Sequence, residues 1–356
     1  MAKTDTGCKT NSGRFFEGFR PGETLVHATP RTATSGDQAL YTALYGSRFA
    51  LNSADSFAQG LGLARAPLDD LLVFHLVFGK SVPDISLNAV ANLGYADGRF
   101  LLPVFPGDSL TAVSKVIGRK ENSSGKTGTV YVETTGHNQR GEAVLRYTRW
   151  VMVHKRDAGS AAPEPVVPSL PDAISADQLI VPENMVGKDY DTTLSGSPHL
   201  WEDYSAGEKI DHVDGMTIEE AEHQLATRLY HNTARVHFNQ HAESGGRFGK
   251  RIVYGGHVIS IARALSFNGL ANALNVAAIN GGRHCNPTFG GDTIYAWSEV
   301  LDSAAIPGRN DIGALRLRTV ATKNRPCQDH PFADSEGRID PATVLELDYW
   351  VLMPRR

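Results

Sequence analysis

The sequence predicts an α+β fold that is present twice in one chain. Residues 14–32 read RFFEGFRPGETLVHATPRT and residues 199–217 read HLWEDYSAGEKIDHVDGMT, and four identical residues recur at a spacing of 185. They are Glu17, Gly22, Glu23 and His27, which return as Glu202, Gly207, Glu208 and His212. This spacing is that of a whole domain, whereas a solenoid unit has roughly 20–50 residues. In each copy strands follow one apolar helix, without the regular strand–helix alternation of a Rossmann fold.

Later segments repeat as well and set the expected domain boundaries. The segments that begin at Ser86 and Ser266 share three residues at a spacing of 180, and both copies end in a similar strand. The matches pair Asn88 with Asn268, Ala91 with Ala271, Asn92 with Asn272, Asp108 with Asp292 and Trp150 with Trp350. The stretch between the copies is rich in Pro, Ala and Ser, as linkers are. We therefore expect an N-terminal domain over residues 10–155, a linker over 156–184 and a C-terminal domain over 185–356.

Each copy is expected to begin with a helical segment and to continue with an apolar helix. The first segment spans residues 37–51 in copy one and 218–230 in copy two, where acidic residues come early and a basic residue late, as suits the helix dipole. The apolar helix of copy two has no clean polar face, which predicts burial on most sides. Its residues are Val258, Ile259, Ile261, Ala262, Ala264 and Leu265. Copy one offers residues 71–77 and then 85–93, interrupted by Pro83.

Strands are expected after the apolar helix, because the sequence there alternates or is rich in aromatic and β-branched residues. The expected strands are residues 110–117, 128–135 and 144–153 in copy one, and 292–300, 314–321 and 344–353 in copy two. Residues 324–341 are an insertion in copy two and are expected to form a polar surface loop. One long helix and several antiparallel strands per copy describe a sheet that wraps around a central helix.

Composition and charge exclude several classes of protein. The chain has 356 residues, 41% hydrophobic and 21% charged, which describes a globular protein. Its net charge of −4 gives no reason to expect nucleic acid or an acidic membrane surface as a partner. No stretch approaches the roughly 18 apolar residues of a membrane helix, and the polar start lacks the apolar core of a signal peptide. Three widely separated cysteines, Cys8, Cys285 and Cys327, argue for a reducing cytoplasm, and with His284 and His330 they do not have the spacing of a zinc site.

The residues that carry chemistry lie just before the apolar helix of copy two and at its start. Three histidines and an asparagine precede two glycines there: His231, Asn232, His237, His241, Gly255 and Gly256. Backbone N–H groups at a helix start favour negative charge, and glycine lets a substrate approach closely. A histidine that faces such donors is the minimum equipment for proton transfer beside an oxyanion. From the residues alone, a surface or capping role for these histidines stays equally open.

This segment resembles the signature of the MaoC-like, R-specific enoyl-CoA hydratases. Their pattern runs Asp-x-Asn-Pro-x-His and later reaches a His-Gly at the helix start. Here its catalytic His falls on His237, its Asp on Asn232, and Tyr254 and Gly255 take the places of the His-Gly. The strings PDISLNAVANLGYADGRF, YGGHVISIARALSFNGLANA and GDTIYAWSEVL give a closer likeness to members that act on a branched, carboxylate-bearing substrate. The resemblance covers both copies and implies a double hotdog, two tandem domains that each wrap a sheet around a central helix.

The resemblance implies a hydro-lyase that acts on an enoyl-CoA thioester. His237 is expected to take the proton of water, Asn232 to hold that water, and the N–H of Gly255 to bind the thioester oxygen. The expected substrate contacts are Arg235, Tyr254, Gly256, Arg251 and Arg283. Arg235 replaces the proline of the pattern and is the first candidate for the substrate's free carboxylate, because Arg binds carboxylates bidentately. A surface ion pair is the alternative for Arg235.

Copy one has no histidine in its corresponding stretch, residues 45–52, and is expected to be a degenerate half that shapes the cleft. With Asn232 in place of Asp, His237 is either the sole base or shares that role with a carboxylate. The nearest carboxylates in sequence are Glu220, Glu222 and Glu243. The rival functions are another MaoC-like hydratase, an acyl-CoA thioesterase, which usually places a carboxylate at the helix start, and an acyl-CoA binding module. No metal or redox cofactor is expected, because the thioester already acidifies the α-proton, and CoA itself is part of the substrate. The chain is expected to form a homodimer.

Overall fold

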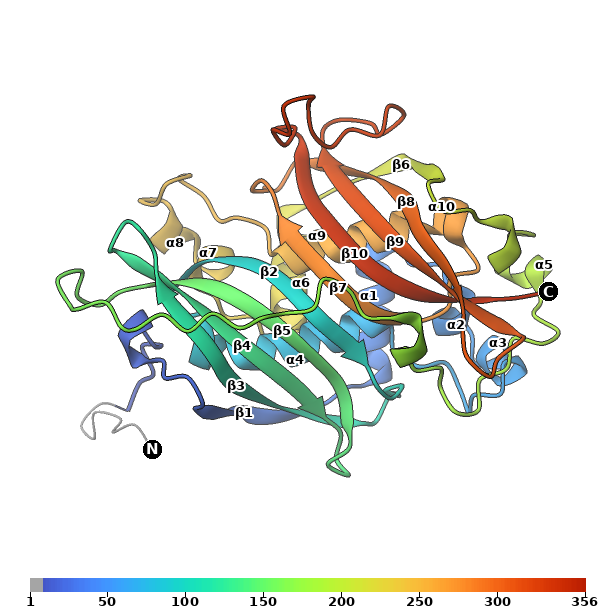
Figure 1. Cartoon of the computed structure of the whole chain (residues 1–356), viewed down its shortest axis with the longest axis horizontal. Coiled ribbons are helices and arrows are strands. Elements are labelled where there is room, and N and C mark those ends of the chain that lie inside the picture. Colours follow the sequence, from blue (N-terminus) through green and yellow to red (C-terminus); the bar gives the residue numbers. More distant parts are fainter. Residues whose placement is uncertain (1–8) are drawn as a thin grey trace.

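The computed structural model describes residues 9–356, and their strands form one ten-stranded antiparallel sheet (Figure 1). The strand order is β1-β3-β4-β5-β2-β7-β10-β9-β8-β6, so the two copies contribute one half each and meet where β2 pairs with β7. The strands of copy one are β1 (Thr24–Thr32), β2 (Ala89–Phe100), β3 (Ser109–Glu121), β4 (Thr127–His137) and β5 (Ala143–His154). Those of copy two are β6 (Lys209–Thr217), β7 (Val276–His284), β8 (Thr293–Ala305), β9 (Ile312–Lys323) and β10 (Thr343–Pro354).

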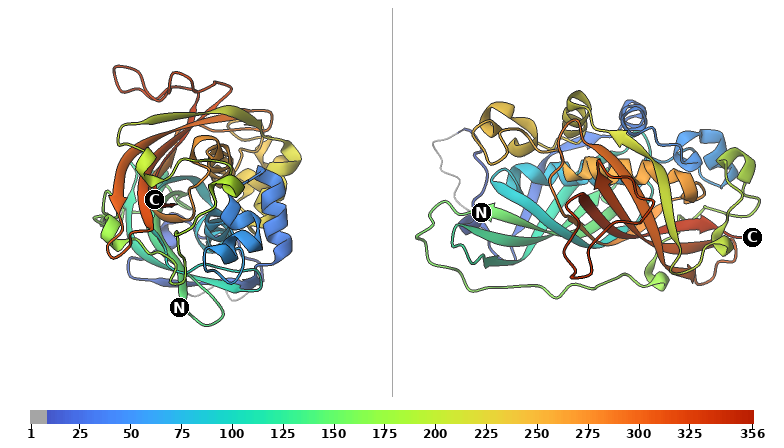
Figure 2. Two further views of the ribbon diagram at one scale, coloured as in Figure 1. Left: turned by 90° about the vertical axis from the view of Figure 1, so that its right-hand side faces the viewer. Right: turned by 90° about the horizontal axis from the view of Figure 1, so that it is seen from above.

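One central helix lies against each half-sheet, and the shorter helices lie on the same side of the sheet (Figure 2). In α4 (Asp70–Ile85) every residue from Leu71 to Val82 is buried, and in α9 (Gly255–Leu265) only the two end residues are not. The predicted all-round burial is confirmed, and with it the double-hotdog α+β fold. The other helices are α1 (Ser35–Tyr45), α2 (Ala50–Ser53), α3 (Asp55–Gly60), α5 (Thr192–Ser195), α6 (Glu220–Leu229), α7 (Arg235–Phe238), α8 (Gln240–Glu243) and α10 (Phe267–Leu270).

Two helix predictions for copy one are wrong. The helix predicted over residues 37–51 ends at Tyr45, because Gly46 adopts a left-handed conformation (φ 59°) that closes α1. Residues 85–93 do not continue the central helix. Pro83 lies in the last turn of α4, and β2 begins at Ala89. Residues of β2 pair with both β5 and β7, and this tertiary pairing overrides the helix propensity of its alanines.

All six predicted strands are present, with longer bounds, whereas β1, β2, β6 and β7 were not predicted. The insertion over residues 324–341 is a loop, as expected, yet it is not purely a surface feature. Cys327 is buried, and Phe332 lies under the guanidinium of Arg318, 3.9 Å from the ring centroid. The loop therefore covers part of the outer side of the second half-sheet. Cys285 and Cys327 are free thiols, and Cys8 lies outside the described residues.

Equivalent residues of the two copies contact each other, which places them beside a pseudo-twofold axis. Tyr45 and Tyr230 are 185 residues apart, and their hydroxyl oxygens are 2.7 Å apart. His75 and Ser260 have the same spacing, and Nε2 of the histidine lies 2.9 Å from the serine Oγ. The axis therefore passes between α4 and α9, and a site at one helix start receives residues from both copies.

Hydrogen bonds correct the predicted register of one repeat. The side-chain amide of Asn88 donates to the carbonyls of Ser12 and Arg14, and that of Asn272 donates to those of Ser197 and His199. Asn88 therefore corresponds to Asn272, four residues beyond the partner that the sequence match had given it. The error arose because an Asn-x-x-x-Asn pattern matches itself equally well in either alignment. The same offset of 184 makes Phe100 of β2 the counterpart of His284 of β7.

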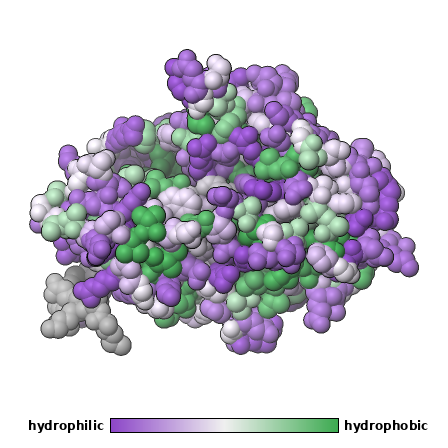
Figure 3. All heavy atoms as spheres, viewed as in Figure 1, coloured by the Kyte–Doolittle hydropathy of each residue, from purple (hydrophilic) through white to green (hydrophobic). Residues whose placement is uncertain are grey.

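The segment between the copies is held along the outer side of the sheet (Figure 1). Arg119 and Val166 form an isolated bridge, and the carbonyl of Ile174 accepts from Nε1 of Trp350 at 2.9 Å. Hydrophilic residues alternate with smaller hydrophobic patches on this face (Figure 3). Within residues 9–356, no helix has the length and apolar character needed to cross a bilayer.

Candidate active site

The start of helix α9 has backbone donors that no side chain occupies. Tyr254 precedes the helix in an extended conformation and makes no side-chain capping bond. The N–H of His257 donates to the carbonyl of Tyr254 at 2.9 Å, whereas those of Gly255 and Gly256 have no acceptor within residues 9–356. Free N–H groups at a helix start favour negative charge. This end of α9 therefore suits an anionic oxygen.

His237 lies beside this helix start, on the short helix α7. Its ring centroid is 5.6 Å from that of Tyr254, and Nδ1 lies 2.9 Å from the carbonyl oxygen of Ile252. Because a carbonyl only accepts, the proton sits on Nδ1 and Nε2 keeps its lone pair. No other described residue bonds to Nε2. Burial lowers the pKa of His237 to about 4, so the ring is neutral at pH 7 and able to accept a proton.

A second imidazole, His284, lies against the same helix start and was not predicted to act there. A Cβ atom added to Gly255 would lie 2.3 Å from Cε1 and 2.4 Å from Nε2 of His284. Burial and then the proximity of His237 lower the pKa of His284 to about 4. From the sequence, His284 was considered only as a metal ligand. A usable signal was that this histidine ends a strand behind two glycines, in the place where copy one has Phe100.

Copy one also contributes to this site. The hydroxyl of Tyr95 on β2 lies 3.4 Å from Nε2 of His284. His75 on α4 lies beside Gly256, where an added Cβ would be 2.6 Å from its Cε1, and Nδ1 of His75 is 3.4 Å from the hydroxyl of Tyr254. Burial and the nearby His257 lower the pKa of His75 to about 3. The site is therefore a neutral, largely aromatic environment made by both copies.

Asn232 is buried shortly before α7, and its Oδ1 accepts from the N–H of Ala234 at 3.1 Å. This bond fixes the loop that leads to His237. The predicted role of Asn232 in holding water remains a prediction.

The three predicted arginines are not gathered at the start of α9. Arg283 is wrong as a substrate contact, because it donates to Glu346 at 2.7 Å and lies over Phe332 on the outer side of the sheet. Neighbouring side chains of a strand point to opposite faces, and its neighbour His284 takes the inner one. Arg251 is bonded to Glu220 and Gln224.

Arg235 is exposed and reaches toward copy one. Its guanidinium donates to Oδ1 of Asn88 at 3.3 Å and to the carbonyl of Ser12 at 3.5 Å. Both bonds are long and neither acceptor is charged, so a substrate role for Arg235 stays a prediction.

The carboxylates considered as helpers are either paired or only partly buried. Glu220 bonds to His223 at 2.9 Å and to Arg251 at 2.7 Å, and this pairing holds its pKa below the ordinary range despite partial burial. Glu222 and Glu243 are not buried. His237 thus has imidazole and phenol groups as its described neighbours.

Copy one repeats the framework of the site with different chemistry. Asn52, the counterpart of His237, donates from Nδ2 to the carbonyl of Pro67 at 3.2 Å, which corresponds to the bond from His237 to Ile252. An amide keeps that bond but cannot accept a proton at neutral pH. At the start of α4, Asp69 accepts from the N–H of Leu71.

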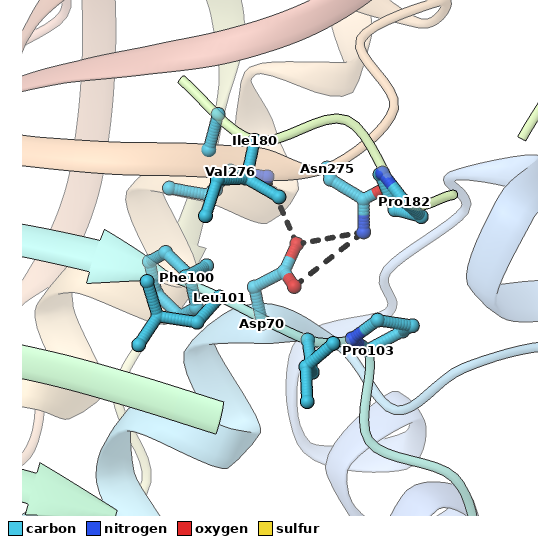
Figure 4. A pocket seen from close by; sticks show the side chains of 10 residues that line it. Asp70, Phe100, Leu101, Pro103, Ile180, Pro182, Asn275 and Val276 are labelled. Atoms are coloured by element: carbon cyan, nitrogen blue, oxygen red, sulfur yellow. Dashed lines mark hydrogen bonds between the residues drawn. The ribbon is translucent and has the colours of Figure 1, made fainter. Parts of the chain in front are cut away.

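Asp70 is the counterpart of Gly255, and its carboxylate lines a pocket at the start of α4 (Figure 4). It accepts from the N–H of Val276 at 2.9 Å and from the side chain of Asn275 at 3.2 Å. Burial and the adjacent Asp69 raise the pKa of Asp70 to about 7. A carboxyl group thus stands where copy two has a glycine.

The chain is similar to known proteins over nearly its whole length. The chain is 68% identical over 348 residues to the β-methylmalyl-CoA dehydratase of Chloroflexus aurantiacus, covering 98% of this chain and 99% of that one. It is 60% identical over 351 residues to the mesaconyl-CoA hydratase of Cereibacter sphaeroides, covering 98% and 100%. A crystal structure of a MaoC domain protein from Chloroflexus aurantiacus has a TM-score of 0.96 at 67% identity, covering 98% and 100%. A Mycobacterium tuberculosis protein with a double hotdog fold has a TM-score of 0.74 at 24% identity, covering 96% and 99%, and supports the fold alone.

Fold and relatives together define a double-hotdog dehydratase of the MaoC-like class. Residues 2–331 match the family described as mesaconyl-CoA hydratase. The chain belongs to the mesaconyl-CoA hydratase family.

Proposed function

We infer that this protein adds water reversibly to 2-methylfumaryl-CoA, also called mesaconyl-C1-CoA, to give β-methylmalyl-CoA. The hydroxyl adds to C3, the carbon next to the free carboxylate, and a proton adds to C2, the carbon next to the thioester. The observation that carries the proposal is the neutral His237, with a free Nε2, beside the uncapped start of α9. One group accepts a proton and the other receives negative charge, as a hydration requires.

The reaction uses these two groups in sequence. Nε2 of His237 takes one proton of water while the oxygen attacks C3. The electrons of the double bond move toward the thioester oxygen, which gains enolate charge and is held by the N–H of Gly255. The imidazolium then returns its proton to C2, and the thioester carbonyl forms again. Atoms balance with water as the sole co-reactant, and we propose that neither metal nor redox cofactor takes part.

A thioesterase is the rival reading, and residues 254–257 offer it no carboxylate. Incubation with mesaconyl-CoA separates the possibilities. Loss of the absorbance of the conjugated thioester without free thiol indicates a hydratase, release of thiol indicates a thioesterase, and no change indicates a binding module.

We also propose that copy one is a degenerate half that shapes the cleft and that the protein is a cytoplasmic homodimer. The widely spaced cysteines support a reducing compartment. Light scattering coupled to size exclusion tests the dimer.

A further inference from the structure

A buried arginine of copy one has no acidic partner. Arg149 on β5 is 0% exposed, and in the described part of the chain only its Nη2 has an acceptor, Oγ of Ser81 at 2.9 Å. Its Nε and Nη1 are closed to solvent and have no acceptor within residues 9–356. Its guanidinium lies over the ring of Phe78, 4.2 Å from the centroid. A buried cation is costly unless an anion compensates it, so the surroundings of Arg149 lack one anion.

Arg149 adjoins the candidate active site along two routes. Tyr95 is its cross-strand partner, and the hydroxyl of Tyr95 lies 3.4 Å from His284. Phe78, which carries the guanidinium, has its ring centroid 5.6 Å from that of Tyr254. Tyr254 in turn contacts His237. Tyr95 alone therefore lies between Arg149 and His284, and Phe78 and Tyr254 lie between Arg149 and His237.

Asn92 adds a second unpartnered group on the same side of the sheet. Both its side-chain oxygen and its side-chain nitrogen are buried without a partner in the described chain. Its cross-strand partner is Val151, two residues after Arg149 and on the same face of β5. An amide N–H beside a guanidinium is a suitable second donor to a carboxylate.

The second buried arginine shows what a structural role looks like here. Arg263 on α9 donates to Oγ of Ser266 and to the carbonyls of Ala273 and Leu274. At the position of copy two that corresponds to Arg149, the chain has the neutral Tyr349, whose hydroxyl bonds to Thr319 at 3.0 Å. The buried arginine without an acidic partner therefore lies next to the candidate active site and has no charged equivalent in copy two.

We propose that Arg149, with Asn92 on the same face of the sheet, binds the free carboxylate of the substrate and so selects carboxylate-bearing enoyl-CoA thioesters. The proposal rests on the proposed hydration and identifies the specificity residue of that site. A carboxylate held at Arg149 fixes C3, the carbon bonded to it, relative to the base. It also supplies the anion that Arg149 lacks.

The test compares two substrates that differ in one group. Tiglyl-CoA has the carbon skeleton of mesaconyl-CoA with a methyl in place of the carboxylate. Arg149→Met should lower kcat/KM for mesaconyl-CoA by about 10²–10³-fold, as loss of one partner of a buried ion pair does, and leave the value for tiglyl-CoA within about threefold. Arg149→Met should also be at least as stable as wild type, because it removes an uncompensated buried charge. Arg263→Met is the matched control: it should destabilise the protein and leave the ratio of the two substrates unchanged.

Each outcome decides between the readings. Equal losses with both substrates, or no loss with either, overturn the role of Arg149. If Arg149→Met does not fold, Arg149→Lys is used, and a substrate ratio equal to that of wild type, together with lost stability, likewise overturns it. A wild-type protein that does not hydrate mesaconyl-CoA at all refutes the proposed function itself, and this inference with it.

Discussion

Replacing His237 with asparagine tests the proposed base in a way that the chain itself suggests. Copy one already has Asn52 in the equivalent place, and its amide makes the corresponding bond to Pro67 at 3.2 Å. His237→Asn should therefore keep a bond to Ile252 and change the free energy of unfolding by less than about 1 kcal/mol. The variant lacks a group that accepts a proton at pH 7.

The loss of a positioned general base is worth roughly 10²–10⁴ in rate, which is about 3–5 kcal/mol of transition-state free energy. We expect kcat with mesaconyl-CoA to fall by at least 10²-fold, and His237→Ala should lose as much. The assay follows the absorbance of the conjugated thioester, and urea unfolding measures stability.

Asn52→Ala is the matched control in copy one. It should lower stability by about 1 kcal/mol through the lost hydrogen bond while kcat stays at the wild-type value. A His237→Asn protein that retains kcat within about threefold, or an Asn52→Ala protein that loses as much activity as His237→Asn, would refute the assignment of the base to copy two.

Three further predictions concern Gly255, Asn232 and the buried histidines. In Gly255→Ala the new Cβ would lie 2.3 Å from His284, so the imidazole ring must move by about 1 Å, and kcat should fall by roughly 10²-fold. The control is Gly245→Ala, whose added Cβ has no atom within 4 Å, and its kcat should equal that of wild type. Asn232→Asp keeps the acceptor for Ala234 but adds a buried anion near a bound carboxylate, so KM for mesaconyl-CoA should rise while an uncharged enoyl-CoA is handled no worse than by wild type. Equal KM values for mesaconyl-CoA would contradict the repulsion. The free energy of unfolding, measured with urea, should fall as the pH is lowered from 7 to 5. Burial lowers the pKa of five histidines to about 3 or 4 in the folded protein. Below pH 6.5 these histidines therefore bind protons only in the unfolded chain, which stabilises the unfolded state. Burial raises the pKa of Asp70 to about 7 and also raises that of Asp69, so these two groups oppose the five histidines. A constant free energy over that range would show that the rings are not neutral when folded.

The sequence was sufficient for features that local patterns encode. The repeat predicted two copies of one domain, and the apolar residues around 259–265 predicted a buried central helix. His237 and Gly255 were predicted together because one short motif contains both. The missed strands β2 and β7 pair with each other across the two copies. Local sequence patterns do not encode such a long-range contact.

Residues far apart in the sequence complete the site, and spacing carries no signal for them. Tyr95 comes from copy one and meets His284 only because β2 pairs with β7, and Arg149 lies next to Tyr95 because β2 also pairs with β5. Strand register explains the choice of the wrong arginine. Arg283 and His284 are neighbours, and one position along the strand determines which of them faces the helix.

The starts of α4 and α9 differ in whether carboxyl groups occupy their backbone N–H groups. In copy one Asp69 caps α4, which is worth about 1 kcal/mol relative to an uncapped start, and Asp70 ties the helix to β7. In copy two the N–H groups of Gly255 and Gly256 have no acceptor among the described residues, so α9 lacks the stabilisation that a capping side chain gives. In the proposed reaction the anion that meets these donors is the enolate oxygen, whose charge develops only as water adds. An interaction made in the transition state and absent before it lowers the barrier without tightening substrate binding. Under the proposed function, the carboxyl groups at the start of α4 stabilise copy one, and their absence at the start of α9 leaves copy two with the single reactive site.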